Sequence, residues 1–336
     1  MQALNNYINE IKTLPAAPQV LSQLLVQLNR DETHADQIVQ LIAFDPALTA
    51  KVLQRCNSAA SASRGAVADL DAAVARLGFN TIYSLVALVV GESMLGAAQR
   101  GYGLGAGQLW EHSATTAVAT KAVARHYGGD ENLVFTAALL HDIGKLVLGA
   151  FLEDSRDWLM RETGPSGHSF LEAEKAILGV DHAEIGGRVL EQWKFPANLT
   201  AAVRFHHDPV KARPNEELAS YVHLGDIIAH YLGHAEGYQS FAVRCQAEAL
   251  EILEIRPREI EELILEAETA WQALDWSNPR QIRMTNRFAS WSWMIRRSRA
   301  KSSHPACSRL LTSKWWARRW TLMRRATAYW SCGPMS

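Results

Sequence analysis

Cysteine is scarce in this chain of 336 residues, whose four cysteines are Cys56, Cys245, Cys307 and Cys332. They are far apart and form no Cys-x-x-Cys pair, so the sequence predicts neither a disulfide framework nor a cysteine zinc site. Long apolar runs are also missing, because the longest uncharged one, residues 79–91, is too short to span a bilayer. The N-terminus lacks the basic start and apolar centre of a signal peptide. We therefore expect a cytoplasmic protein with no transmembrane segment.

Acidic residues are absent from residues 281–336, which contain ten Arg, two Lys and six Trp. The first 280 residues carry 22 basic and 35 acidic side chains, so the acidic body and the basic tail are separate parts. We predict that residues 279–336 are disordered or non-native, and dispensable for folding. An engineered or out-of-frame C-terminus would give this composition. If the tail is native, Arg with aromatics favours nucleic acid or an anionic membrane surface as its partner.

Alternating β-type patterns are nearly absent, and apolar residues recur at three and four positions, as in Leu21, Leu24, Leu25 and Leu28. This spacing predicts an all-α protein. We expect an N-terminal helical subdomain over residues 1–100 and a second helical subdomain over residues 101–278. A helix from Thr81 to about Ala97 is apolar on nearly all sides, which predicts that it is the buried joint between the two. The glycine-rich residues 101–107 predict a hinge after it, because no strand precedes them and no Lys-Ser/Thr follows.

Local signals mark several element boundaries in the first half of the chain. Asp45 followed by Pro46 predicts a helix start, with the acid at the N-cap and proline at the first helical position. Asn57, Ser58 and Ala59 predict a loop, and Asn80 predicts the cap of the apolar helix.

The chemistry of the sequence is concentrated around His141 and Asp142, which follow two leucines and offer one nitrogen and one oxygen ligand to a divalent ion. We expect Gly144 to end the helix that carries them. Lys145 follows at once, where a cation either meets a phosphate or favours the negative end of the helix dipole.

Further candidate ligands occupy other predicted helices. Asp181 and Glu184 form a capping box that places His182 in the first turn of a helix. His223, Asp226 and His230 share one helix face, and of these we select Asp226, treating both histidines as ordinary hydrogen-bonded residues. We treat His34, His126, His168, His234 and His304 in the same way. The predicted metal ligands are His112, His141, Asp142, His182, His206, His207 and Asp226.

This ligand set contains nitrogen and oxygen donors and no thiolate, which favours Fe or Mn and also suits Mg, Ni or Zn. Two such ions polarise a phosphoryl oxygen and lower the pKa of a bound water, which is the chemistry of phosphodiester hydrolysis. For that reaction we name Asp142 and Lys145 as the catalytic residues. The sequence contains no nucleophile elbow or Rossmann glycine pattern that would indicate another activity.

The sequence resembles the H…HD…D signature of the HD metal-dependent phosphohydrolase superfamily. The resemblance lies in His112, in residues 139–145 around His141 and Asp142, and in Asp226. Further motifs resemble the HDOD family, the HD-related output domains of bacterial signalling proteins. They stand at residues 14–20, 45–48, 57–59, 75–78, 179–186, 193–196 and 206–209. The resemblance covers about residues 10–240.

The resemblance implies a bacterial signal-transduction output module of all-α fold, with a signalling protein as partner and a nucleotide as a possible ligand. The alternative is an active metal-dependent phosphohydrolase acting on a nucleotide or cyclic dinucleotide. Related HD-GYP phosphodiesterases follow their paired histidines with Gly-Tyr-Pro, whereas His206 and His207 are followed by Asp208 and Pro209. Arg204 is the nearest second basic residue that could hold a phosphate.

Overall fold

The structure is a computed structural model that describes residues 7, 20, 21, 23, 24, 35–43, 45–59, 67–155, 158, 159, 170–234, 245–256 and 258–273. Three groups of sequence predictions lie outside these residues. They concern the proline-bearing motif at residues 14–18, the histidines His34, His168 and His304, and the tail over residues 279–336.

The described residues form helices, with one isolated β-bridge between Gln99 and Leu104, which confirms the predicted all-α class. The α-helices are α3 (Ala35–Ala43), α4 (Pro46–Ala59), α5 (Leu70–Leu77), α6 (Phe79–Leu95), α7 (Gln108–Tyr127), α8 (Glu131–Leu140), α9 (Lys145–Leu152), α11 (Phe170–Leu178), α12 (His182–Gln192), α13 (Ala197–Arg204), α14 (Glu216–Tyr231), α15 (Ala247–Ile252) and α16 (Ile260–Ala273). Three short 3₁₀ turns, η1 (Arg100–Tyr102), η2 (Glu153–Ser155) and η3 (Pro209–Ala212), lie between them.

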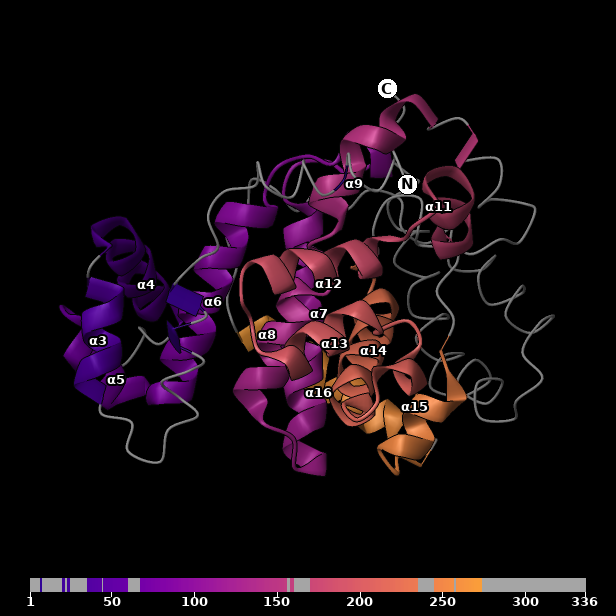
Figure 1. Cartoon of the computed structure of the whole chain (residues 1–336). Helices are drawn as coiled ribbons and strands as arrows, with labels where there is room; N and C mark the ends of the chain where they lie inside the picture. The colour runs from indigo at the N-terminus through magenta and orange to yellow at the C-terminus, as the bar shows by residue number, and fades with distance from the viewer. Residues whose placement is uncertain are drawn as a thin grey trace, which may run out of the picture.

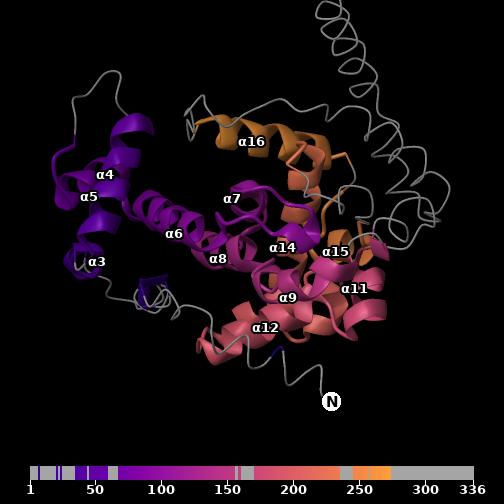
Figure 2. The same ribbon diagram turned by 90° about the horizontal axis from the view of Figure 1, so that it is seen from above.

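Helices α3, α4 and α5 form a small lobe beside a larger body, and α6 runs from one to the other (Figures 1 and 2). α6 packs on α4 and α5 in the lobe and on α7 and α8 in the body. It is buried on nearly all sides, and Val86 at its centre is 0% exposed. This placement is the one expected for a joint, while the exact division into residues 1–100 and 101–278 stays a prediction.

The start of α4 follows the predicted chemistry, because Asp45 Oδ1 accepts hydrogen bonds from the backbone N–H groups of Ala47 and Leu48. Two other boundary predictions are wrong. Asn57 lies within α4 rather than in a loop, and its side-chain amide exchanges two hydrogen bonds with the backbone of Val67. Asn80 lies inside α6, whose N-cap is Gly78.

The glycine-rich residues 101–107 do not form the predicted hinge. Residues 100–102 form the 3₁₀ turn η1, and Gly101 and Tyr102 are buried against α9. A Cβ atom at Gly101 would lie 2.0 Å from the carbonyl oxygen of Gly149, so glycine here permits two backbones to touch. The glycine serves close packing instead of flexibility.

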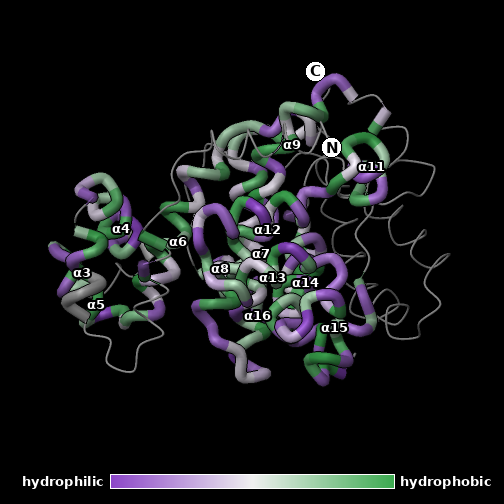
Figure 3. Tube along the Cα trace, viewed as in Figure 1, coloured by the Kyte–Doolittle hydropathy of each residue, from purple (hydrophilic) through white to green (hydrophobic). Residues whose placement is uncertain are grey.

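In the body, α7 packs against α8, α14 and α16, and α13 packs against α8, α12 and α14 (Figure 1). Most of these helices contain both hydrophobic and hydrophilic residues (Figure 3). Among the described residues, one segment is apolar and long enough to cross a membrane, Glu131–Ser155. Its most apolar window is 83% buried inside the fold, which is typical of a core helix pair, here α8 and α9.

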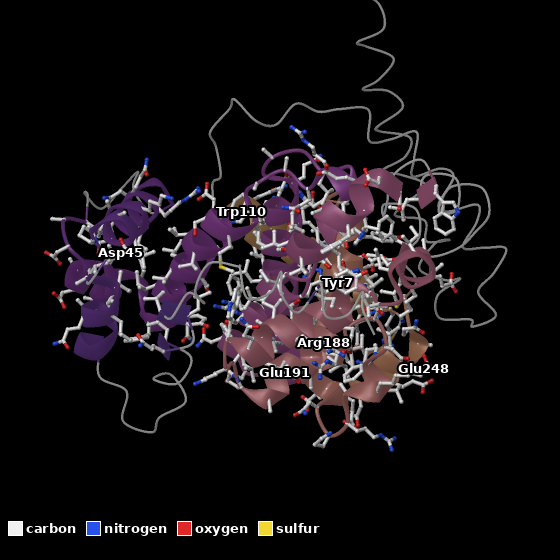
Figure 4. The ribbon with its side chains drawn as sticks, turned by 45° about the horizontal axis from the view of Figure 1, so that its top comes forward. Tyr7, Asp45, Trp110, Arg188, Glu191 and Glu248 are labelled. Atoms are coloured by element: carbon white, nitrogen blue, oxygen red, sulfur yellow. The ribbon has the colours of Figure 1, made fainter. Side chains whose placement is uncertain are left out.

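Tyr7 is packed on the body, although the sequence analysis assigned residues 1–100 to the N-terminal subdomain. Its ring meets Phe151 edge-on with centroids 4.8 Å apart, and its hydroxyl donates to the carbonyl oxygen of Leu178 at 3.2 Å. Figure 4 shows Tyr7 with the body, away from the lobe that contains Asp45. Tyr7 therefore belongs to the body, although it precedes the lobe helices in the chain.

Candidate metal centre

Five parts of the body bring all seven predicted ligands together. α7 supplies His112, the turn between α8 and α9 supplies His141 and Asp142, and α12 supplies His182. The turn after α13 supplies the adjacent His206 and His207, and α14 supplies Asp226. Six of the side chains are no more than 2% exposed, and His207 is half-buried.

The turn with His141 and Asp142 differs from the predicted helix end. α8 stops at Leu140, residues 141–144 form a turn, and α9 begins at Lys145. Gly144 precedes α9 as its N-cap, with a φ of −63° that any residue adopts, so it does not end the helix as we predicted. A Cβ atom there would lie 2.0 Å from the carbonyl oxygen of His182, so the turn and α12 touch through their backbones.

The first group of ligands surrounds the carboxylates of Asp142 and Asp226. His112 Nε2 lies 3.1 Å from Asp226 Oδ1 and 3.7 Å from Asp142 Oδ2. His141 Nε2 lies 3.2 Å from Asp142 Oδ2 and 3.9 Å from Asp226 Oδ1. Two imidazoles and two carboxylates can therefore ligate one ion.

The second group shares Asp142 with the first. His182 Nε2 lies 3.2 Å from Asp142 Oδ1 and 2.9 Å from His207 Nε2, so the two histidines share a hydrogen bond. The ring of His206 stands between the groups, with its centroid 3.9 Å from that of His207 and 4.9 Å from that of His141. Ligand atoms of His182, His206 and His207 lie within 4.8 Å of one another. Asp142 is therefore common to the two groups of candidate ligands.

The imidazoles are oriented in a common way, because Nδ1 of each of four histidines faces an oxygen atom of the protein. Such a contact fixes a proton on Nδ1, so Nε2 is the nitrogen that a metal would use after displacing any proton or hydrogen bond there, as in known metal sites whose histidines donate Nδ1–H to an oxygen. The contacts are His112 to His234 O (2.7 Å), His141 to Ala138 O (2.7 Å), His206 to Val203 O (2.7 Å) and His182 to Glu174 Oε2 (2.7 Å).

The electrostatics of the cluster favour a cation. Burial opposes ionisation of Asp142, but His141, Lys145 and His182 outweigh it and hold its pKa well below the usual range. Burial likewise opposes the ionisation of Asp226, and His230 and His112 keep its pKa well below the usual range. For His141, burial lowers the pKa, but Asp142 and Asp226 outweigh it and raise the pKa to about 9. The two carboxylates that stabilise this proton would also attract a metal ion, which would displace the proton on binding.

His206 tests whether the residues fit a metal. Burial, reinforced by the charges of His141 and His182, lowers its pKa to about 3, so its imidazole is neutral. Its Nε2 atom is buried and has no hydrogen-bond partner among the described residues. A buried polar atom without a partner costs about 1–3 kcal/mol, and a coordinated ion would remove that cost. The donor set of imidazoles and carboxylates therefore fits a divalent metal.

Lys145, predicted to meet a phosphate or a helix dipole, is instead buried and pairs with Asp142. Its ammonium group also lies over the ring of Tyr102, 5.9 Å from the centroid. Arg204, the second basic candidate, pairs with Glu184 at 3.3 Å and with Glu191 at 2.9 Å. Both cations are therefore engaged with carboxylates of the protein.

Sequence reasoning missed Glu174 on α11. This carboxylate is 0% exposed, and it accepts hydrogen bonds from the backbone N–H and Nδ1 of His182 and from the hydroxyl of Tyr102. It orients a predicted ligand. Nothing in the sequence marks it, because a glutamate on an amphipathic helix is usually at the surface.

The two histidines that flank Asp226 on α14 differ. His223 uses both ring nitrogens within the protein, since Nδ1 faces His206 O at 2.8 Å and Nε2 accepts from the backbone N–H of Gln246 at 2.9 Å. It is a structural residue, as predicted. His230, which the sequence analysis treated in the same way, lies in the cluster, with its ring 4.8 Å from that of His112. The available signal was its position four residues after Asp226.

The comparisons with known proteins extend over most of this fold. A family model described as the HDOD domain matches residues 14–209. An uncharacterized protein of Treponema pallidum (strain Nichols) is 24% identical over 255 residues, which cover 69% of this chain and 45% of that protein. The chain therefore spans about half the length of this relative.

Solved structures share the fold at low sequence identity. A proposed phosphohydrolase from Shewanella amazonensis SB2B is 23% identical, with a TM-score of 0.59 over 80% of this chain and 98% of that one. An HDOD domain protein of unknown function from Geobacter sulfurreducens is 22% identical, with a TM-score of 0.60 over 79% and 87%. A proposed signal transduction protein from Marinobacter aquaeolei VT8 is 20% identical, with a TM-score of 0.59 over 81% and 64%.

Proposed function

Because this chain belongs to the HDOD family, we propose that it is a signal-transduction output module with divalent metal ions in its His/Asp cluster. His112, His141, Asp142 and Asp226 would hold one ion, and His182, His206 and His207 would hold a second next to Asp142. Fe or Mn is favoured by the mixed nitrogen and oxygen donors, and Mg, Ni or Zn is compatible with them. The observation that carries this proposal is the shared orientation of four imidazoles, which turn Nδ1 to the protein and keep Nε2 for the cluster.

A regulatory role fits the burial of the site better than rapid turnover does. A hydrolase must admit its substrate to the ions, whereas six of the seven ligands are no more than 2% exposed. His207 is the one half-buried member of the set. Ions held in this way would join α7, α12, α13, α14 and the His141 turn into one unit. Metal occupancy would then set the stability of the surface that the module presents to a signalling protein in the cytoplasm.

Metal-dependent phosphohydrolysis is the second candidate, and the complete ligand set favours it. Bound ions would supply Lewis acidity to a phosphoryl oxygen and an activated water. The chain itself would hold those ions through the carboxylate of Asp142, which His141 and Lys145 keep ionised. However, Lys145 and Arg204 already neutralise carboxylates of the protein, so little positive charge remains for a nucleotide phosphate.

Elemental mass spectrometry of protein purified without a chelating column tests the metal site. We expect at least one divalent ion per chain, and less metal in His141→Ala and in Asp142→Ala. His126→Ala is the matched control, since the His126 side chain is 53% exposed and pairs with Glu266 outside the cluster. Circular dichroism of each variant checks that the fold is retained.

Equal metal content in all these variants would refute the site. Incubation of the metal-loaded protein with a cyclic dinucleotide and with bis(4-nitrophenyl) phosphate separates the two functions. No hydrolysis is expected for the regulatory module, and hydrolysis that disappears with Asp142→Ala would establish the enzyme instead.

A further inference from the structure

His230 repeats the features of the predicted ligands without belonging to the predicted set. It lies on α14, one helical turn after Asp226, and is 3% exposed. Its Nδ1 atom lies 2.9 Å from the backbone carbonyl oxygen of Asp226 and 3.0 Å from Asp226 Oδ1. The carbonyl oxygen accepts a hydrogen bond at this nitrogen, which places the ring proton on Nδ1 and the lone pair on Nε2.

The second nitrogen of His230 is buried and has no hydrogen-bond partner within the described part of the chain. One of the two ring nitrogens of His230 lies within 4.8 Å of ligand atoms of both His112 and Asp226, so the ring is at the edge of this ion position. His223, on the same helix, is equally buried, but protein groups satisfy both of its nitrogens. The contrast indicates that His230 is built to bind something that the protein does not itself provide.

We infer that His230 is an additional metal ligand, at the ion position formed with His112 and Asp226. This inference rests on the proposed metal-binding function and deepens it. With His112, His141 and His230 the first position has three imidazoles beside its two carboxylates. Imidazole nitrogen favours Zn²⁺, Ni²⁺ or Fe²⁺, whereas carboxylate and water oxygens favour Mg²⁺ and Mn²⁺. His230 would therefore shift the preference of this position toward nitrogen-seeking metals.

A competing role for His230 is to orient Asp226 through Nδ1 without touching the ion. The substitution His230→Asn separates the two roles, because the asparagine amide can reproduce the donor near Nδ1 and has no counterpart of Nε2. An orienting residue is therefore rescued by asparagine, and a ligand is not. Dissociation constants for Zn²⁺ and for Mn²⁺ are the quantities to measure, on the full chain after removal of bound metal.

For His230→Asn we expect the Zn²⁺ dissociation constant to rise at least about tenfold more than the Mn²⁺ constant. An unchanged ratio of the two constants would overturn the inference and leave the metal site in place. Failure of the unmodified protein to bind either ion would overturn both. His126→Asn is the control and should leave both constants unchanged.

A second measurement needs no variant. In ¹⁵N-labelled wild-type protein, Zn²⁺ should move the Nε2 resonance of His230 to the shift of a metal-bound nitrogen. The Nε2 resonance of His223 should keep the shift of a hydrogen-bond acceptor. A His230 Nε2 resonance that does not respond while those of His112 and His141 do would also overturn the inference.

Discussion

The hydroxyl of Tyr102 donates a hydrogen bond of 2.6 Å to Glu174 Oε1, and the other oxygen of that carboxylate holds His182. The ring of the same tyrosine lies against the ammonium group of Lys145, which pairs with Asp142. Tyr102, in the segment between α6 and α7, therefore contacts both Glu174, which orients His182, and Lys145, which pairs with Asp142. Through these contacts, the segment that follows α6 packs against residues that position the candidate metal ligands.

Tyr102→Phe removes the hydroxyl and leaves the Glu174 carboxylate without one of its donors. We expect a loss of about 1.5–3 kcal/mol in the free energy of unfolding, since the hydrogen bond is buried and its acceptor is charged. Urea denaturation measures this loss. Tyr127→Phe is the control, because Tyr127 donates to Glu259 near the surface and its loss should cost less than about 1 kcal/mol. Equal losses in the two variants would argue against a special role for Tyr102.

Val86→Asp places a carboxylate at the centre of α6, where the side chain is 0% exposed. Burial of an unpaired charge should cost at least about 3 kcal/mol and destabilise lobe and body together. Thermal unfolding followed by circular dichroism measures the effect. Val210→Asp, at a position 41% exposed on η3, should change the midpoint little. A Val86→Asp protein as stable as Val210→Asp would show that α6 is not the joint.

Gly144→Ala would push a methyl group into the carbonyl oxygen of His182, 2.0 Å away. The turn and α12 would have to separate, which should cost about 1–3 kcal/mol and misplace His182 relative to Asp142. We expect lower stability and a lower metal content, measured by denaturation and elemental analysis. Gly105→Ala adds the same methyl group 3.4 Å from the Gln108 side chain and should be tolerated. Normal metal content in the Gly144 variant would refute this account of the turn.

Glu259 gives a prediction about acid stability, because its hydrogen bonds with Arg256 lower its pKa to about 2 from an ordinary 4.5. A carboxyl group with a lowered folded pKa stabilises the fold above its unfolded pKa. That contribution disappears as the pH falls from about 4.5 to about 2. Glu259→Gln and Arg256→Gln should each flatten the stability profile over this range, measured by denaturation at a series of pH values. The effect is expected to be small, and about 1 M salt should shrink it, because the pair is at the surface. Profiles parallel to wild type would contradict it.

The helical class and the position of the His141 turn were predictable because each depends on a short-range pattern. Leu21 and Leu24 repeat at helical spacing, and both are buried. His141 and Asp142 follow an apolar helix, so their position at a buried turn could be expected. The resemblance to HDOD proteins then predicted which distant histidines join them, a relation that no local pattern contains.

Other features depend on contacts between residues far apart in the chain, which local patterns do not encode. Glu174 is buried because Tyr102, 72 positions away, and His182, on the next helix, both contact it. Gly101 lies in a glycine-rich segment that predicts a hinge, yet its backbone packs closely against that of Gly149. In each case the prediction assumed the most common role of that residue type, and a contact with a distant residue gives it a different role.

The contact between Tyr7 and Leu178 has a consequence for the order of folding. The two residues are 171 positions apart, so Tyr7 cannot dock until α11 has been synthesised and placed. Contacts of such long range form late, since the entropy of closing the chain must be offset first by nearer contacts. Tyr7 is thus synthesised long before the partner that secures it. Until then, the ring of Phe151 lacks its contact with Tyr7, and this apolar surface of the nascent protein is exposed to chaperones or to aggregation.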